Sequence, residues 1–191
     1  MPLTFTQTSL QTVYGLFTIR VYQEALGKET VVVYTNNLDI SQPVLTRVHS
    51  ECLTGDTFGS LYCDCGEQLK KSLELIQREG GVCIYLRQEG RGIGLFEKIK
   101  AYQLQREGYD TVEANVMLGH APDERTYGMA EQALRDLTIS SIRLLTNNPD
   151  KVSELKKYGI NVVERVPLVI PATAHNQAYL QTKKDKLHQL L

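Results

Sequence analysis

Hydrophobic and polar residues alternate in short runs along the first third of the chain. The runs cover residues 15–22, 29–35 and 44–49, and turn-forming residues such as Gly27 and Pro43 separate them. Alternation with a period of two is typical of a strand that buries one face. We therefore expect three antiparallel strands in this part of the chain.

The remainder of the chain combines helical periodicity with short apolar runs. Apolar residues recur at intervals of three and four in segments 69–76, 95–102 and 129–137. A further helix is expected to open at Asn148-Pro149 and to close at Gly159, and a peripheral helix is expected after Pro171. The strands expected here are residues 82–87, 141–145 and 162–166.

Together these elements predict a mixed α+β fold. Its sheet should combine an antiparallel N-terminal β portion with a second part in which helices and strands alternate. With 191 residues, of which 42% are hydrophobic, the chain is long enough to bury one core, and we expect a single domain over residues 1–191.

Charge and hydropathy limit the classes of protein. The 21 basic and 22 acidic side chains nearly cancel, which argues against a general DNA or RNA binder. The N-terminus lacks the pattern of a secretory signal, and no apolar run is long enough to span a membrane. We expect a cytoplasmic protein with no nucleic-acid or membrane partner, in which cysteines are thiolates, metal ligands or core residues rather than disulfides.

Three of the four cysteines form a cluster in the sequence: Cys52, Cys63 and Cys65 are spaced C-x10-C-x-C. Thiolates are strong zinc ligands, and three of them leave a fourth tetrahedral position for water or substrate, as a catalytic zinc requires. The same spacing allows a structural zinc with His49 or an acidic side chain as fourth ligand, or three unrelated buried thiols. Cys83 lies in the apolar run GVCIYL, and we expect it in the core.

Glycines and basic residues suggest a site for an anion. The segment RQEGRGIGL at 87–95 places three glycines between a predicted strand and a predicted helix, where backbone amides can approach a phosphate. It fits neither the Walker A nor the dinucleotide pattern, and a tight turn explains it equally well. The basic residues Arg47, Arg91, Arg125 and Lys151 lie in separate turn-like segments, and a triphosphate needs several such cations and a magnesium ion.

Asp123 and Tyr102 each have a structural and a functional interpretation. Asp123 precedes a predicted helix, where an aspartate is typically an N-cap. Tyr102 falls on the apolar face of its predicted helix, so core packing is the ordinary explanation. Neither residue is assigned a role by its spacing alone.

Six segments, in order, resemble the GTP cyclohydrolase II family. They are RVHSECLTGD at 47–56, CDCGEQL at 63–69, RQEGRGIGL at 87–95, YDTVEAN at 109–115, DERTYG at 123–128 and LLTNNPDKV at 144–152. Further similarity runs through 159–168 and into the lysine-rich tail. The domain that makes dihydroxybutanone phosphate in some relatives has no counterpart here, so the sequence resembles the stand-alone form.

The resemblance implies an activity and a set of functional residues. The family hydrolyses GTP, releasing formate and pyrophosphate in the first step of riboflavin biosynthesis. Cys52, Cys63 and Cys65 would then hold one zinc ion whose water attacks C8 of the imidazole ring. By the same resemblance Asp123 transfers protons, Arg125 is the nucleophile at the α-phosphate, and Tyr102 lies near the ring-opening chemistry.

The resemblance also implies a binding site for GTP, with magnesium on the triphosphate, and a homodimer. An amide such as Gln68 or a carboxylate such as Glu51 can read the Watson–Crick edge of guanine. The residues that would bind GTP are Arg47, Val48, His49, Ser50, Glu51, Gln68, Glu89, Gly90, Arg91, Thr111, Thr146 and Lys151.

Guanidinium chemistry leads to a different expectation for Arg125. A guanidinium with a pKa above about 12 has no free lone pair, so we expect Arg125 to stabilise charge on the phosphoryl group while water attacks. Two other functions stay open. One is a family variant that retains the formyl group or the pyrophosphate, and the other is a zinc-stabilised nucleotide-binding or RNA-binding module without turnover, although basic and aromatic residues do not interleave as RNA binding requires.

Overall fold

The computed structural model describes residues 4–121, 123–187 and 190. The strands are β1 (Thr4–Thr12), β2 (Gly15–Gln23), β3 (Glu29–Tyr34), β4 (Val44–Ser50), β5 (Gly81–Leu86), β6 (Ser141–Leu145) and β7 (Asn161–Val166). The α-helices are α1 (Leu53–Asp56), α2 (Cys65–Glu79), α3 (Leu95–Arg106), α4 (Thr111–Met117), α5 (Gly128–Asp136), α6 (Pro149–Lys157) and α7 (Gln177–Leu187). Among these described residues, short 3-10 helices are η1 (Ala25–Gly27) and η2 (Glu89–Gly92).

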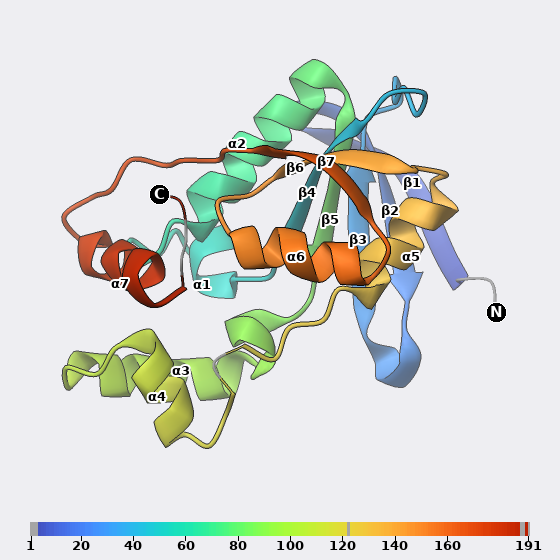
Figure 1. Cartoon of the computed structure of the whole chain (residues 1–191). Coiled ribbons are helices and arrows are strands. Elements are labelled where there is room, and N and C mark those ends of the chain that lie inside the picture. Colours follow the sequence, from blue (N-terminus) through green and yellow to red (C-terminus); the bar gives the residue numbers. More distant parts are fainter. Residues whose placement is uncertain (1–3, 122, 188–189, 191) are drawn as a thin grey trace.

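The strands form one mixed sheet in the order β1-β2-β3-β5-β4-β6-β7 (Figure 1). β1, β2, β3 and β5 pair antiparallel in succession, whereas β4 pairs in parallel with both β5 and β6, and β6 pairs in parallel with β7. The predicted mixed α+β fold is therefore confirmed. The expectation that residues 44–49 form an antiparallel strand is wrong, because the chain reaches β5 through α2, and such a crossover joins parallel strands.

Helices cover both faces of the sheet, and two groups of core residues correspond to the two faces. On one face, Val48, Ile84 and Leu144 pack with residues of α5 and α6. On the other face, Leu45 and Cys83 pack with residues of α2. β4 and β5 are thus buried on both sides, and Cys83 is the core residue that the sequence predicts.

The parallel strands create a crevice at one edge of the sheet. β5 lies on one side of β4 and β6 lies on the other, and the helices that lead to them cover opposite faces. In open α/β sheets, ligands bind outside the carboxyl ends of the strands at such a change of direction. Segments 51–56, 87–92 and 146–151 therefore begin at the same edge.

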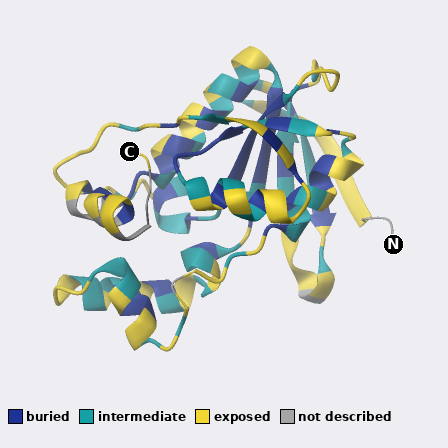
Figure 2. Ribbon diagram, in the orientation of Figure 1, coloured by how far each residue is buried: buried dark blue, intermediate teal, exposed yellow. Residues whose placement is uncertain are grey.

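The helices α3 and α4 pack together and lie away from the sheet, beyond this edge (Figure 1). They are largely half-buried or exposed, while the central strands are buried (Figure 2). Within the described part of the chain, no helix has both the length and the apolar character needed to cross a membrane.

Candidate active site

A cavity of about 490 Å³ opens at the carboxyl ends of β4, β5 and β6. A volume of this size is typical of small-molecule sites. Of the residues that the resemblance assigns, all except Val48 line it: Arg47, His49, Ser50, Glu51, Cys52, Cys63, Cys65, Gln68, Glu89, Gly90, Arg91, Tyr102, Thr111, Asp123, Arg125, Thr146 and Lys151. The Val48 side chain is fully buried in the core, and its main-chain carbonyl accepts a hydrogen bond from Lys151 Nζ at 3.0 Å.

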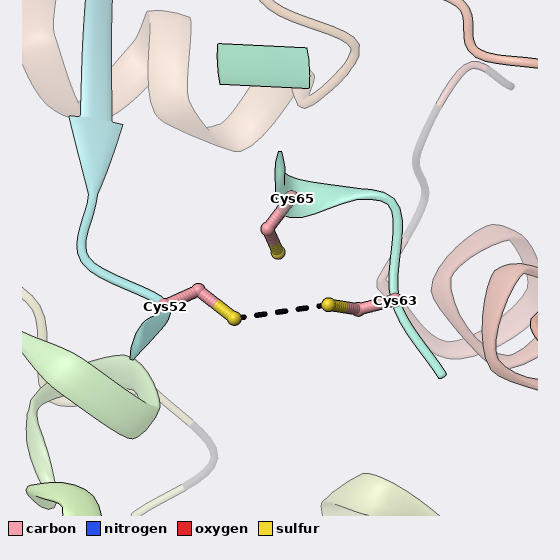
Figure 3. Close-up of side chains that lie close together, drawn as sticks. All are labelled: Cys52, Cys63 and Cys65. Carbon is pink, nitrogen blue, oxygen red and sulfur yellow. Dashed lines mark hydrogen bonds between the residues drawn. The ribbon is translucent and has the colours of Figure 1, made fainter. Parts of the chain in front are cut away.

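Three sulfur atoms meet at this cavity. Cys52 follows β4, Cys63 lies two residues before α2, and Cys65 is the first residue of α2. Figure 3 shows their side chains pointing toward one another. All three Sγ atoms lie within 4.8 Å of one another, and Cys52 Sγ and Cys63 Sγ are 3.7 Å apart. Sulfurs bound at about 2.3 Å to a tetrahedral zinc would lie about 3.8 Å apart. The three thiols are therefore not unrelated core residues, and their geometry fits one metal ion.

Close packing of two glycines keeps the cysteine segments together. A Cβ atom at Gly55 in α1 would lie 2.8 Å from Cys63 Sγ and 3.2 Å from Cys52 Sγ. A Cβ atom at Gly66 in α2 would lie 2.3 Å from the carbonyl oxygen of Gly55. Larger residues at these positions would push the sulfurs apart, so the chain preserves the room that a metal needs.

Hydrogen bonds among the three thiols favour one thiolate, at Cys52, over three thiolates. Hydrogen bonds from Cys63 and Cys65 lower the pKa of the Cys52 thiol. The hydrogen bond to Cys52 raises the pKa of Cys63 to about 11. Since metals bind thiolates, loading this cluster would release protons.

His49 is held by Asp56 and Arg47 and is not a fourth metal ligand beside the three cysteines. Its Nε2 lies 3.0 Å from Asp56 Oδ2, and its Nδ1 lies 3.4 Å from Arg47 Nη2. Burial lowers the pKa of His49 despite the hydrogen bond to Asp56. Asp56 also accepts hydrogen bonds from the Cys52 amide at 3.0 Å and from Tyr85 Oη at 2.8 Å. His49 therefore supports the cysteine segment through Asp56 rather than as a ligand.

A chain of buried hydrogen bonds joins β4 to the C-terminal helix. Arg47 Nη2 donates to Gln68 Oε1 at 2.7 Å, and Gln68 Nε2 donates to Asp64 Oδ2 at 2.6 Å. Asp64 in turn pairs with Lys183 of α7 at 2.6 Å. Arg47 Nε is buried and, among the described residues, has no hydrogen-bond partner. The Gln68 amide keeps one donor and one acceptor position beyond these bonds.

The 3-10 helix η2 brings main-chain groups to the cavity. Gly90 and Arg91 both have φ of 62°, a conformation that glycine adopts easily and that is uncommon for arginine. A Cβ atom at Gly92 would lie 2.9 Å from the carbonyl of Glu124, and the Glu124 amide donates to the Arg91 carbonyl at 2.9 Å. This close approach fixes the glycine segment against the irregular segment that carries Asp123 and Arg125.

Lys151 enters the cavity wall from the first turn of α6. The helix begins as the sequence predicts, with Pro149 in its first turn and with Asn148 accepting a hydrogen bond from the Asp150 amide at 2.9 Å. Burial, followed by the charges of Arg47 and Arg125, lowers the pKa of Lys151 well below its usual value. A ligand anion at this position would favour the charged form.

Asp123 and Arg125 form an ion pair, and Asp123 is not a helix cap. The Asp123 carboxylate accepts hydrogen bonds from Arg125 Nε at 2.8 Å and from Arg125 Nη2. Burial would raise the pKa of Asp123, but these hydrogen bonds and the charge of Arg125 lower it. The capping alternative is wrong because α5 begins at Gly128, with Tyr127 at the N-cap position.

Tyr102 lines the cavity rather than packing only in the core. Its hydroxyl lies 3.3 Å from Oγ1 of Thr54, which follows Cys52 by two residues. Burial raises the pKa of its phenol. Thr111, in the first turn of α4, lies on the same side of the cavity as α3, because α3 and α4 pack together.

Several residues at the site were not identified from the sequence: Asp56, Asp64, Lys98 and Lys183. They are charged side chains that spacing alone places on solvated surfaces. Their contacts join segments as far apart as residues 64 and 183. A weak signal existed only for Asp56, which follows Cys52 by four residues and so can accept from its amide at the start of a helix.

Comparison with known proteins gives a consistent result. A family model described as GTP cyclohydrolase II matches residues 4–167. The riboflavin biosynthesis protein RibBA of Bacillus cereus (strain G9842) is 54% identical over 187 residues, which is 97% of this chain and 47% of that protein. RibBA of Bacillus subtilis (strain 168) is 55% identical over 186 residues, 96% of this chain and 47% of that protein. The chain thus spans about half the length of the curated relatives it matches.

A solved structure shows only a distant likeness. It is RibBX, a two-domain 3,4-dihydroxy-2-butanone 4-phosphate synthase from A. baumannii, with 18% sequence identity and a TM-score of 0.43. The match covers 76% of this chain and 34% of that one.

Proposed function

The chain belongs to the GTP cyclohydrolase II family, and on that premise we propose that it hydrolyses GTP, opening the imidazole ring at C8 and releasing formate and pyrophosphate. This reaction would be the first step of riboflavin biosynthesis. The observation that carries the proposal is that one cavity holds both a cluster of three sulfurs and several separate cations. The proposed reaction needs both features, because the base would react at the metal that the sulfurs hold while the phosphates require positive charge.

Cys52, Cys63 and Cys65 would hold a single zinc ion. A zinc with three protein ligands acts as a Lewis acid and brings the pKa of water to about 7. Gly55 and Gly66 would keep the cysteine segments at the required separation, and Asp56 would fix the amide of Cys52. Tyr102, whose hydroxyl lies near Thr54, would hold or move a proton beside the opening ring.

Guanine recognition would come from Gln68 and Glu51. The Gln68 amide is oriented by Arg47 and Asp64 and keeps one free donor and one free acceptor position. Glu51 is half-buried, and burial raises the pKa of its carboxyl. Two side chains of this kind can match the donors and the acceptor on the Watson–Crick edge of guanine.

The triphosphate would be bound by cations from three segments. Arg91 in η2, Arg125 before α5 and Lys151 in α6 all line the cavity. Thr146, which accepts a hydrogen bond from the Asn148 amide, would fix the loop between β6 and α6. A magnesium ion bridging phosphate oxygens would complete the neutralisation.

Arg125 would stabilise charge on the α-phosphate rather than attack it. Its ion pair with Asp123 favours the protonated guanidinium, which has no lone pair for attack. Water would then be the nucleophile, and Asp123 would hold Arg125 in place or take up a proton as the phosphoryl group transfers.

The experiment that tests the proposal is incubation of the chain with GTP, zinc and magnesium, followed by mass analysis of every product. We expect a diaminopyrimidinone ribosyl phosphate, formate and pyrophosphate. A product that keeps the formyl group or the pyrophosphate would indicate a family variant, because the two losses change mass independently. Binding without any new product would support the nucleotide-binding module instead.

A homodimer stays a prediction from the family resemblance, and a cytoplasmic location stays a prediction from the sequence pattern. Light scattering coupled to size-exclusion chromatography would measure the oligomeric state.

A further inference from the structure

Lys98, on α3, directs its ammonium toward the sulfur cluster. Its Nζ lies 3.2 Å from Cys52 Sγ and 3.1 Å from Thr54 Oγ1. Only 8% of the residue is exposed, although lysine is a residue that normally stays on the surface. A buried ammonium requires partners, and here one of them is a cysteine of the candidate metal site.

Glu89 holds this ammonium and ties it to the cysteine segment. Glu89 Oε1 accepts hydrogen bonds from Lys98 Nζ at 2.7 Å and from the Gly90 amide at 2.7 Å. Its other oxygen, Oε2, accepts a hydrogen bond of 2.6 Å from the amide of Leu53, the residue after Cys52. Both carboxylate oxygens are therefore used inside the protein, which leaves little of this side chain for a nucleotide.

We propose that Lys98 is a positioning residue of the metal site, donating a hydrogen bond to the Cys52 sulfur, and that Glu89 acts through Lys98 rather than on the nucleotide. The inference rests on the metal site of the proposed function. It changes the role of Glu89, which the family resemblance places among the residues that bind GTP.

The first contribution of Lys98 to the metal site is its positive charge. Three thiolates exceed the charge of a divalent ion by one, and the Lys98 ammonium balances that excess next to Cys52. A hydrogen bond to a thiolate also withdraws electron density from it, so the metal receives less and remains a stronger Lewis acid. Orientation matters as well, because the same contact fixes the Cys52 side chain toward Cys63.

The helix α3 offers a matched control. Lys100 lies two residues from Lys98, its side chain is 45% exposed, and it pairs with Glu97 at 2.9 Å. It does not line the cavity. Lys100→Met therefore removes the same charge from the same helix without touching the sulfurs.

Cobalt(II) added to the zinc-free protein gives a direct readout, because thiolate-to-cobalt charge-transfer absorption reports how strongly each sulfur donates. Without its hydrogen bond a sulfur donates more readily, so we expect Lys98→Met to move this absorption to longer wavelength. Lys98→Arg should restore it toward the wild-type position, and Lys100→Met should leave it unchanged. With zinc, Lys98→Met should lose turnover by about 10- to 100-fold, as is usual for partners of metal ligands.

Glu89→Gln tests the second half of the proposal. We expect the charge-transfer absorption to shift as in Lys98→Met and kcat to fall, with KM for GTP unchanged. A raised KM without any spectral shift would overturn the role given to Glu89. If Lys98→Met does not fold, the double variant Lys98→Met/Glu89→Gln removes both charges of the buried pair and should show the same shift.

A cobalt spectrum of Lys98→Met, or of the double variant, identical to that of the wild type would overturn the role of Lys98 while leaving the metal site intact. Absence of thiolate-to-cobalt absorption in the wild-type protein would overturn the metal site and this inference together. Because the spectrum requires no GTP, failure of the proposed reaction alone would leave the predicted shift in place.

Discussion

The ammonium of Lys183 lies 2.6 Å from the carboxylate of Asp64. Asp64 is 1% exposed and stands between Cys63 and Cys65 in the sequence. The pair joins α7 to the segment that carries two of the three sulfurs, so the C-terminal helix forms part of the wall of the site.

Lys183→Met should lower the free energy of unfolding by about 3 kcal/mol, because it leaves a buried carboxylate without its cationic partner. Lys184→Met, at an exposed position of the same helix, should change it by less than about 0.5 kcal/mol. Urea denaturation of the two variants and the wild type measures both values. Equal midpoints for Lys183→Met and Lys184→Met would show that the buried pair adds nothing to stability.

Gly55→Ala should weaken metal binding while the chain still folds, because the added Cβ meets Cys63 Sγ at 2.8 Å and displaces the sulfurs. Gly128→Ala serves as the control, since its Cβ would meet only the Tyr158 ring at an ordinary 3.5 Å. Competition with a chromophoric chelator measures zinc affinity in each variant. Wild-type affinity in Gly55→Ala would mean that the cysteine segment adjusts without cost.

Asp123→Ala and Arg125→Ala should fold and bind GTP but turn it over about 10²- to 10³-fold more slowly, the usual loss when a group that stabilises transition-state charge is removed. Arg135→Ala, at an exposed position on α5, should retain full turnover. Steady-state kinetics and GTP binding separate the two effects.

Rapid quench of the wild-type reaction should yield no covalent adduct on Arg125, because the ion pair with Asp123 favours the protonated guanidinium. Mass analysis of the quenched chain tests this directly. A guanylyl group on Arg125 would instead establish it as the nucleophile.

Anion binding should take up a proton at Lys151. In the free protein, burial and the charges of Arg47 and Arg125 lower its pKa from the usual 10.5, so the side chain loses its proton as pH rises through that lowered pKa. A bound phosphate raises the pKa again; binding is therefore coupled to proton uptake, and affinity falls as pH rises between the two pKa values.

Calorimetry of pyrophosphate binding in buffers of different ionisation enthalpy measures this uptake. The wild type should take up more protons than Lys151→Met, and the difference cancels any titration of the ligand itself. Equal proton uptake by both proteins would contradict the assignment to Lys151.

Local patterns predicted most of the fold, and the elements they missed have identifiable reasons. β1 is rich in Thr and Gln and mostly exposed, so it shows no apolar alternation, and it is held by pairing with β2 along its whole length. α4 was missed because seven residues are too few to show a helical period. Its start could still have been recognised, since Asp110 and Glu113 form a capping box. The direction of β4 was missed because it depends on which strands become its neighbours, and local periodicity does not contain that information.

Some residues of the candidate site could likewise be predicted from local patterns, and others could not. The cysteine spacing and the glycine segment are local patterns, and the structure brings both to one cavity. The contact of Lys98 with Cys52, and that of Lys183 with Asp64, joins segments distant in sequence, and a lysine that will be buried looks like any surface lysine. Such residues are visible only once the chain has folded.

The central claim is that three cysteines hold the metal on which GTP hydrolysis depends. Formate release should be measured on one preparation as zinc is removed by a chelator and then restored, with Cys52→Ser assayed alongside. We predict that the rate follows the zinc content, reaches its maximum at one zinc per chain, and stays near zero in Cys52→Ser. Undiminished formate release from zinc-free protein, or from Cys52→Ser without zinc, would contradict the account.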